Sequence, residues 1–255
     1  MSFLAALRFL TIIPLPGRCE ASPEELGRSI VYFPLVGVII GVILVGLNWL
    51  LGLLLPSALT NVLLVVSLVA VSGALHLDGL VDTCDGLAGG KTVEERWQVM
   101  DDSRAGGFGI IGVCCLLLVK YVALNNVPAR WLMLTLVLMP LLSRWTMVYA
   151  LFAYPYAKPS GLGKVFKQGA SRLRFVVATV ITLVAAVVLA RLAGFIMLAG
   201  FIIMLAIWVI ALAVATYLKG KFGGLTGDTY GAINEVAEVC ILILVCLLAH
   251  IGWLT

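Results

Sequence analysis

Long apolar runs dominate this chain and leave few architectures open to it. Hydrophobic residues make up 62% of the 255 positions and charged residues only 12%, which is far from the balance of a water-soluble domain. A helix needs about 20 apolar residues to cross a bilayer, and the runs that are long enough lie at 29–55, 58–77, 106–127, 130–153, 174–191, 194–218 and 231–254. Because the alternating pattern of a membrane β-barrel is absent, the sequence predicts an all-α, polytopic transmembrane helical bundle of about seven spans. No hydrophilic linker separates the runs, so we expect residues 1–255 to form a single integral-membrane domain.

The N-terminal segment does not fit this pattern. Its apolar run, residues 1–13, is too short to span a bilayer, contains Arg8, and ends at Pro14 and Pro16, where a helix stops. It has neither the basic start nor the cleavage site of a signal peptide. We therefore expect an N-terminal helix that is interfacial or re-entrant.

Lys and Arg residues are distributed unevenly between the two sides of the predicted bundle. They are frequent before the first span and in the loops that follow the second, fourth and sixth spans, whereas the other loops hold only Arg130 and Arg191. By the positive-inside rule the basic side faces the cytoplasm, with the N-terminus inside and the C-terminus outside. This topology accounts for the net charge of +4. No basic, aromatic-rich module is present, so we expect no nucleic acid partner.

An acidic cluster interrupts the apolar sequence at the end of the second predicted span. The segment HLDGLVDTCDG carries Asp78, Asp82 and Asp85, and on a helix these spacings place the three side chains within an arc of about 60°. Ionisable groups at a membrane boundary are costly, so they mark a functional site by default. Three anions on one face repel each other unless a hard cation, Mg²⁺ or Mn²⁺, is bound between them. The alternative is that they are solvated loop acids or a helix N-cap.

Three further polar motifs fall on the same predicted face of the membrane. They are TVEERWQVMDDSRAGGFG after the acidic cluster, SGLGKVFKQG at 160–169, and GGLTGDTYGAINEVAE at 223–238. The glycines of the last two allow backbone N–H groups to approach a phosphate near a helix N-terminus, although neither is a Walker A motif. Beside the acids, they indicate a site where metal ions and Lys or Arg bind a diphosphate for phosphoryl-type transfer. To this site we assign His76, Asp102, Arg104, Lys164, Thr226, Asp228 and Glu235.

Several of these side chains also have a purely structural interpretation. Asp102 is expected to bind metal or act as a general base, and Arg104 to hold a phosphate, with a salt bridge between the two as the alternative. Asp228 is expected to cap the last helix. Glu235 is expected to face the substrate inside the bundle, with interhelical hydrogen bonding as the alternative. His76, one turn before the acids, is either a substrate contact or an interfacial hydrogen-bonding residue.

The motifs, in this order, resemble those of the cobalamin synthase family, the adenosylcobinamide-GDP ribazoletransferases. The likeness is carried by HLDGLVDTCDG, MDDSRAGGFG, GLGKVF and GGLTGDTYGAINEVAE, together with the N-terminal FLTIIPLP, and it runs nearly end to end. The chain departs from the family at Ile12, where the family often has a basic residue, and at Phe108, where some members have His.

The resemblance implies a Mg²⁺-dependent transferase of cobalamin biosynthesis in the cytoplasmic (inner) membrane of a bacterium or archaeon. Its substrates would be adenosylcobinamide-GDP and α-ribazole or its 5′-phosphate. A ribose hydroxyl would attack the cobinamide-side phosphorus, GMP would leave, and adenosylcobalamin or its 5′-phosphate would form. The lipid bilayer is the other expected partner, and the sequence leaves open whether the protein is a homo-oligomer.

Two other function classes remain open at this stage. The spacing Asp82-x-x-Asp85-Gly86 also opens the signature of CDP-alcohol phosphatidyltransferases, but the Ala-Arg pair expected soon after it is absent. An ion-coupled transporter would fit the number of spans and the intramembrane residues Lys120, Arg144, Glu235 and Glu238. The polar residues, however, cluster at one mouth of the bundle, whereas a carrier needs access from both sides.

Overall fold

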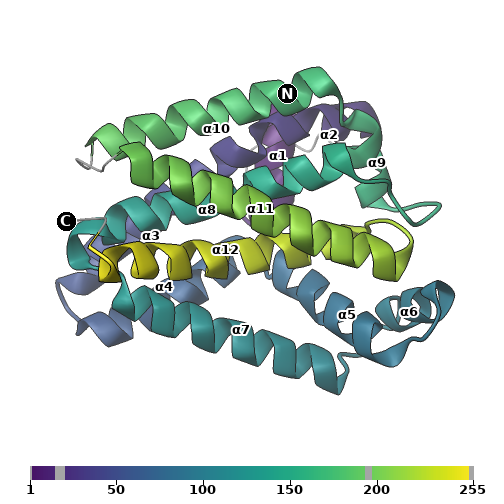
Figure 1. Ribbon diagram of the computed structural model, residues 1–255, viewed down its shortest axis with the longest axis horizontal. Coiled ribbons are helices and arrows are strands. Elements are labelled where there is room, and N and C mark those ends of the chain that lie inside the picture. The colour runs from purple at the N-terminus through teal and green to yellow at the C-terminus, as the bar shows by residue number, and fades with distance from the viewer. Residues whose placement is uncertain (1, 15–20, 193–196, 253–255) are drawn as a thin grey trace.

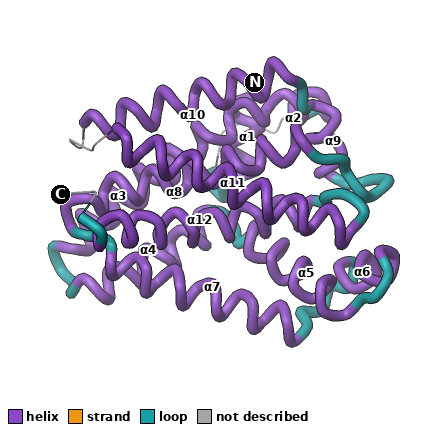
Figure 2. Tube along the Cα trace, viewed as in Figure 1, coloured by secondary structure: helices purple, strands orange, loops and turns teal. Residues whose placement is uncertain are grey.

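The protein is built from helices alone in the part of the chain that is described. The computed structural model describes residues 2–14, 21–192 and 197–252. Figure 2 shows helices joined by short loops, without a strand in these ranges; a single isolated parallel bridge joins Tyr156 and Leu225. The all-α architecture predicted from the sequence is therefore confirmed.

Within the described residues, six helical segments are long and apolar enough to cross a membrane, or seven if a bent pair counts as one span. The chain is thus a multi-pass membrane protein, as predicted. The first segment joins α2, η1 and α3, and the others are single helices. Their bounds are Pro23–Ser29 (α2), Ile30–Tyr32 (η1), Phe33–Gly52 (α3), Gly107–Asn126 (α7), Ala129–Ala153 (α8), Arg172–Leu192 (α10), Met197–Phe222 (α11) and Gly227–His250 (α12).

The second predicted span, 58–77, is wrong at its C-terminal end. Helix α4 (Ser57–Val71) stops early, and α5 (Leu75–Gly89) begins after a break and runs at 88° to it. At the break Gly73 and Ala74 adopt left-handed conformations, with φ of 62° and 56°, which a continuing right-handed helix does not allow. The three Asp residues therefore lie on a helix of their own, which packs against α12, α7 and α6 (Val93–Met100).

The predicted N-terminal helix is present as α1 (Ser2–Leu10) and packs against α2 and α3. The chain that follows it reaches the break between α4 and α5, where the Ile12 N–H donates to the Val71 carbonyl at 2.9 Å. This bond satisfies a carbonyl that the interrupted helix leaves without an intrahelical partner. The N-terminal segment is thereby tied to the start of the acidic helix.

Helix α8 forms the centre of the bundle, and 89% of its most apolar stretch is buried inside the protein. Helix α3 lies directly against it at Gly37 and Gly41, where an added Cβ would overlap the backbone of α8 around Pro140 and Val137. The sequence Gly37-x-x-x-Gly41 therefore brings two helices into close contact, as small residues do in membranes.

The polar motifs gather at one end of the bundle. Figure 1 shows the short helices α2, α6 and α9 (Leu162–Gly169) at the right-hand end, together with the connections α5–α6, α8–α9 and α11–α12. The connections α3–α4 and α7–α8 lie at the opposite end. The loops that the Lys and Arg distribution assigns to one side of the membrane therefore lie at one end of the bundle.

Candidate functional site

A cavity of about 670 Å³ opens at the polar end of the bundle. Its walls come from α1, α3, α5, α6, α8, α9 and α12 and from the loop between α8 and α9. The charged side chains that line it are Asp78, Asp101, Lys158 and Asp228. Segments far apart in the sequence thus contribute to one site, among them all four predicted motifs.

Lys158 lies between two of the acids of this cavity. Its Nζ is 2.7 Å from Asp101 Oδ1 and 3.9 Å from Asp228 Oδ2. Asp82, next to the cavity on α5, is within electrostatic range of Asp78, Asp85 and Asp228. Because one lysine faces several carboxylates, this part of the site carries a surplus of negative charge.

The residues present suit a hard divalent cation, although they do not form a finished set of ligands. No three His, Cys, Asp or Glu side chains of the described ranges stand together as metal ligands. However, the carboxylates of Asp78 and Asp82 accept no hydrogen bond from the described residues, and Asp78 is exposed to the cavity. Free carboxylate oxygens with excess negative charge are the donors that Mg²⁺ or Mn²⁺ prefers.

Asp85 faces away from this cavity and has a different environment. Its two oxygens accept the backbone N–H groups of Gly106 and Gly109, at 2.7 and 2.8 Å. Asp85 is 9% exposed and holds the N-terminus of α7, where a negative charge is favourable. The capping alternative stated for the acidic cluster therefore describes the contacts of Asp85, while Asp78 and Asp82 remain the stronger metal-ligand candidates.

The N-termini of α9 and α12 meet at the cavity. A Cβ added to Gly163 would lie 3.1 Å from the Gly227 nitrogen, and 2.6 Å from the Tyr156 ring beside it. The loops that precede the two helices are joined by the bonds from Ala157 N–H to the Leu225 carbonyl and from Leu225 N–H to the Pro155 carbonyl, at 2.8 and 2.9 Å. Two helix N-termini that point at one cavity are suited to bind an anion.

Tyr156 lies where these two helix ends meet. Burial, reinforced by the charge of Asp228, raises the pKa of its hydroxyl above the usual value for tyrosine, so the side chain stays a neutral hydrogen-bonding group at the edge of the cavity.

Two residues of the glycine-rich motifs have structural contacts. Thr226 is buried and caps α12 in a reciprocal pair with Thr229, so the expectation that Asp228 caps this helix is wrong. Asp228 instead lies in the first turn and lines the cavity. Lys164 is exposed, and its Nζ donates to the Pro159 carbonyl at 2.5 Å, outside the cavity lining.

Asp102 and Arg104 form an exposed pair at a separate, smaller opening lined also by Asp85. Arg104 donates through Nε and Nη2 to the two carboxylate oxygens of Asp102, at 3.0 and 2.8 Å. These hydrogen bonds from Arg104 lower the pKa of Asp102 to about 2. The structure therefore does not bring this pair together with Asp78 and Asp228, although the sequence predicted one site.

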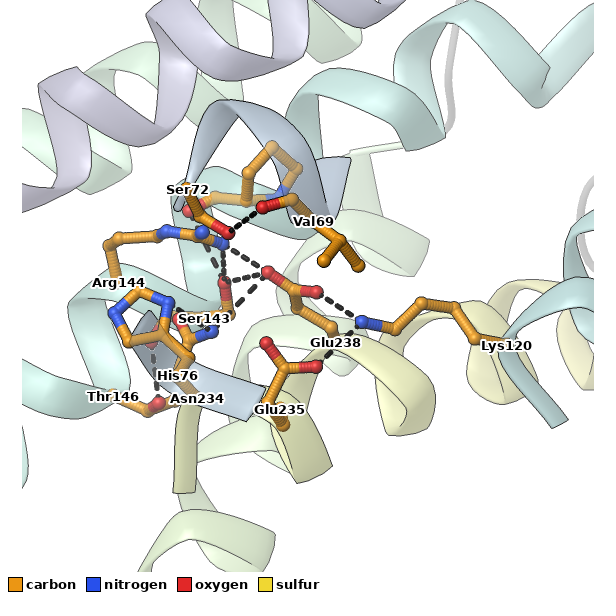
Figure 3. Close-up of polar contacts among 11 residues, drawn as sticks. Val69, Ser72, His76, Lys120, Ser143, Arg144, Thr146, Asn234, Glu235 and Glu238 are labelled. Atoms are coloured by element: carbon orange, nitrogen blue, oxygen red, sulfur yellow. Dashed lines mark hydrogen bonds and ion pairs between the residues drawn. The ribbon is translucent and has the colours of Figure 1, made fainter. Parts of the chain in front are cut away.

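His76 connects the cavity to a buried polar network, which Figure 3 shows in close-up. Its Nδ1 lies 3.3 Å from Asn234 Nδ2, and the Asn234 amide reaches Glu238 at 3.4 Å. His76 is 1% exposed and its Nε2 has no hydrogen-bond partner. A buried ring nitrogen without a partner is costly, so a substrate group that reached it would gain a hydrogen bond.

The same network contains Glu235 but places it away from the cavity. Lys120 Nζ lies 2.8 Å from Glu235 Oε2 and 2.6 Å from Glu238 Oε2, and Arg144 pairs with the other oxygen of Glu238. Helices α7, α8 and α12 are therefore joined by two cations and two carboxylates (Figure 3). Glu235 does not line the cavity, and its observed contacts are those of the interhelical alternative.

Sequence reasoning missed Asp101, Lys158 and Tyr156 as cavity residues. In the sequence, Lys158 is one of the basic residues in the loop after the fourth span, and Asp101 lies within the motif TVEERWQVMDDSRAGGFG. A signal was present, because Lys158 lies just before the glycine-rich SGLGK. Tyr156 had no local signal, since its place depends on the bridge to Leu225.

Comparison with known proteins gives a consistent result. The cobalamin-5-phosphate synthase family model matches residues 2–246. Among curated relatives, an adenosylcobinamide-GDP ribazoletransferase from Geotalea daltonii is 39% identical and covers 96% of this chain and 97% of its own. Proteins of the same name from Roseiflexus sp. and Desulforamulus reducens are 38% and 33% identical, over 93% and 96% of this chain and 86% and 96% of their own. No solved structure matches.

These matches extend over nearly the whole chain and include every motif that carried the resemblance. The family is one of enzymes, which favours a transferase over an ion-coupled transporter. The resemblance stated from the motifs is confirmed, and the chain belongs to the cobalamin-5-phosphate synthase family.

Proposed function

We propose that this enzyme joins adenosylcobinamide-GDP to α-ribazole, or to its 5′-phosphate, and releases GMP. The observation that carries the proposal is the meeting of the α9 and α12 N-termini at a cavity that also holds Lys158 and a surplus of carboxylates. The helix ends and the lysine favour an anion, and the carboxylates favour a cation. A diphosphate bound through Mg²⁺ satisfies both, and the name of the curated relatives includes a substrate with such a diphosphate.

Asp78 and Asp82 are the residues that would hold Mg²⁺, or Mn²⁺ in its place. When bound, the ion would neutralise the diphosphate and stabilise the charge that develops during transfer. The backbone N–H groups at the start of α9 and α12, with Lys158, would hold the phosphate oxygens on the opposite side. Asp85 would act indirectly, by fixing the N-terminus of α7 beside the acidic helix.

In the proposed reaction, a ribose hydroxyl forms a new O–P bond at the cobinamide-side phosphorus, and the bond from this phosphorus to the GMP oxygen breaks. We assign the hydroxyl proton to Asp228, which is half-buried in the cavity and has Lys158 3.9 Å away to stabilise its charged form. Asp102 is less suited to this role, because a carboxylate whose pKa is about 2 is a weak base.

The site would face the cytoplasm of a bacterial or archaeal cell. The polar end of the bundle, where the cavity opens, is also the end to which the Lys- and Arg-rich loops belong, and such loops remain inside during insertion. GMP would then be released into the cytoplasm.

The test is turnover by the purified protein in detergent, with adenosylcobinamide-GDP, α-ribazole and Mg²⁺, followed by chromatography of the products. The proposal predicts GMP together with a cobalamin, and loss of both in excess EDTA. Asp82→Asn should lower kcat by at least about 100-fold, the effect of losing an electrostatic contact in the transition state. Glu94→Gln, which changes an exposed acid on α6 outside the cavity lining, is the matched control.

Two outcomes would contradict the proposal. Full activity in EDTA would exclude the metal, and would leave the acids with a structural role only. Turnover of CDP-diacylglycerol with an alcohol, without any reaction of the cobinamide substrate, would favour the phosphatidyltransferase alternative.

A further inference from the structure

We propose that His76 and Tyr230 bind the ribose hydroxyl next to the reacting hydroxyl of the ribazole substrate, and thereby orient the nucleophile. This inference rests on the proposed function and names two specificity-determining residues of the same site. In one of the proposed substrates the 5′ position of the ribose carries a phosphate, so the reacting hydroxyl is at C2′ or C3′. The hydroxyl that the two residues bind is the other member of this pair.

Two buried polar atoms at the wall of the cavity have no hydrogen-bond partner in the described part of the chain. They are Nε2 of His76, a residue that is 1% exposed, and the hydroxyl of Tyr230, which is 3% exposed. Both residues line the cavity. Buried polar atoms in folded proteins are nearly always paired, and leaving one unpaired is costly. A ligand group that paired with both atoms would recover this cost.

The two side chains come from the closest contact between α5 and α12. A Cβ added to Gly231 would lie 3.1 Å from both the Cα and the carbonyl oxygen of His76, and Tyr230 directly precedes Gly231. His76 stands two residues before Asp78, and Tyr230 two residues after Asp228. A hydroxyl held by this pair would therefore lie beside the one that gives its proton to Asp228.

The buried ion network determines which hydrogen His76 offers to a ligand. Glu238 is paired with Lys120 and Arg144 as a carboxylate, so it requires a donor from its remaining neighbour. Asn234 turns its Nδ2 to Glu238 at 3.4 Å, and the same nitrogen lies 3.3 Å from His76 Nδ1 (Figure 3). An amide nitrogen only donates, so His76 Nδ1 accepts and the ring hydrogen is on Nε2.

A donor and a hydroxyl of this kind suit a substrate hydroxyl better than a phosphate. His76 Nε2 offers a hydrogen, whereas the Tyr230 hydroxyl both donates and accepts. A substrate hydroxyl can accept from the first and donate to the second. The two cations of the neighbouring network are already balanced by its two carboxylates, and burying an anion without a counter-charge is costly. A neutral hydroxyl does not carry this penalty.

The ribose of ribazole fits this place better than the ribose of the GDP group. The hydroxyl next to the reacting one is on the adjacent carbon of the same ring, close to Asp228. The guanosine ribose is separated from the reacting phosphorus by the second phosphate and leaves with it as GMP. A cavity of about 670 Å³ is of the size that encloses a small-molecule ligand such as a nucleoside.

The experiment measures kcat/KM for α-ribazole and for its 2′-deoxy and 3′-deoxy analogues. One analogue lacks the nucleophile and cannot react, while the other lacks only the neighbouring hydroxyl. The proteins are the wild type, Tyr230→Phe, His76→Gln, His76→Leu and Tyr154→Phe. Tyr154 is the matched control, because its hydroxyl pairs with the Leu212 carbonyl at 3.1 Å and the Thr216 hydroxyl at 2.8 Å, and it does not line the cavity.

We expect the wild type to prefer α-ribazole over the reactive analogue by about 100-fold or more, because the analogue leaves both buried atoms unpaired. Tyr230→Phe should lower kcat/KM for α-ribazole by about 10-fold or more and leave that for the analogue unchanged, so the preference shrinks. His76→Gln retains an N–H group and should keep most of the preference, whereas His76→Leu should lose it. The KM for adenosylcobinamide-GDP should stay constant.

Thermal unfolding without substrate distinguishes a substrate contact from a structural one. Tyr230→Phe removes a hydroxyl that has no partner, so its Tm should equal or exceed that of the wild type. Tyr154→Phe removes a paired hydroxyl and should lower the Tm while it keeps the full preference for α-ribazole. A fall in Tm for Tyr230→Phe as large as that for Tyr154→Phe would show a structural role and overturn the inference.

Equilibrium dialysis of the three ribosides, without the cobinamide substrate, separates this inference from the proposed function. Tighter binding of α-ribazole than of one deoxy analogue, lost in Tyr230→Phe, would support the inference even if turnover failed. Equal affinity of the wild type for all three would overturn it, and so would an equal loss of kcat/KM for α-ribazole and the reactive analogue in Tyr230→Phe. A rise only in the KM for adenosylcobinamide-GDP would assign the pair to the guanosine half and also overturn it.

Discussion

Neutralising Glu235 should destabilise the protein far more than it affects catalysis. The Glu235 and Lys120 side chains are 6% and 2% exposed and form an ion pair at 2.8 Å. With Arg144 and Glu238 they make a buried group of two positive and two negative charges. Glu235→Gln keeps the shape of the side chain but leaves this group with an excess positive charge in the membrane-embedded core.

The size of the effect follows from the geometry. Two unit charges 2.8 Å apart attract each other by about 6 kcal/mol at an effective dielectric constant of about 20. Part of this is retained in the variant, because Lys120 keeps its contact with Glu238 at 2.6 Å and the new amide can still accept a hydrogen bond. Removing one partner of a buried pair typically destabilises a protein by about 3–5 kcal/mol. We expect the lower end of that range, which corresponds to a fall in Tm of about 6–12 °C for a chain of this length.

The assay is thermal unfolding in detergent, with kcat and KM measured below the transition. Lys120→Met combined with Glu235→Gln removes both charges of the pair and should recover part of the lost stability, since the remaining Arg144 and Glu238 balance each other. Glu94→Gln on the exposed face of α6 controls for the loss of an acidic side chain. If Glu235→Gln kept the wild-type Tm and instead raised a KM, the residue would be the substrate contact expected from the sequence, and the reasoning from burial would be refuted.

Three other changes test separate parts of the structure. Asp102→Asn should leave the shape of the pH–rate profile unchanged between about pH 5 and 9, because hydrogen bonds from Arg104 hold the pKa of Asp102 at about 2. Any contribution of this pair to stability is present above the ordinary Asp pKa of about 3.9 and is lost only as the pH falls toward 2. A shifted acidic limb would make Asp102 the titrating base. A cysteine placed at Ser160, in a background without the native cysteines, should react with an impermeant reagent only from the cytoplasmic side, and one at Ser57 only from the other side; the reverse labelling would overturn the orientation. Gly73→Ala should lower the free energy of unfolding by about 1–2 kcal/mol, because position 73 has a φ of 62° and a Cβ there would lie 2.8 Å from Ile12 Cγ2. Gly46→Ala is the control, since a Cβ at position 46 meets nothing within 4 Å. Equal stability of the two variants would argue against the bend.

The sequence predicted the spans well because their cause is local. Each run of apolar residues long enough to cross a bilayer forms a helix in any case, since lipid leaves the backbone no other way to pair its polar groups. The break between α4 and α5 has no comparable signature. It occurs at Ser72–Gly73–Ala74, where small residues are also common inside uninterrupted membrane helices. At the break, Ile12 bonds to Val71, a contact between segments that are distant in the sequence.

The candidate site was predictable only as far as helical geometry reaches. Spacing placed Asp78, Asp82 and Asp85 on one arc of a helix, and they do share α5. Spacing could not show that the arc is divided between two neighbours, with Asp85 bound to the start of α7 and Asp78 facing the cavity. In the same way, the inward direction of Glu235 was foreseen, but its pairing with Lys120 depends on how α7 packs against α12.

The bend before α5 is what makes a site out of these separate motifs. A straight continuation of α4 would carry the acids along the axis of α4, at 88° to the direction that α5 takes. The bend instead lays α5 against α12, so closely that a Cβ on Gly79 would lie 2.7 Å from the Asp228 carbonyl oxygen, and one on Gly231 would lie 3.1 Å from the His76 Cα. Glycine at both positions lets the two backbones approach, as small residues do at helix contacts in membranes.

The close approach brings Asp78 and Asp82 beside Asp228 and thereby concentrates negative charge next to a helix N-terminus that favours anions. Neither feature alone would bind a diphosphate, because the acids would repel it and a single helix end holds it weakly. Brought together by the bend, they would hold the proposed cation between them, and this arrangement links the unusual turn in the fold to the chemistry that we propose.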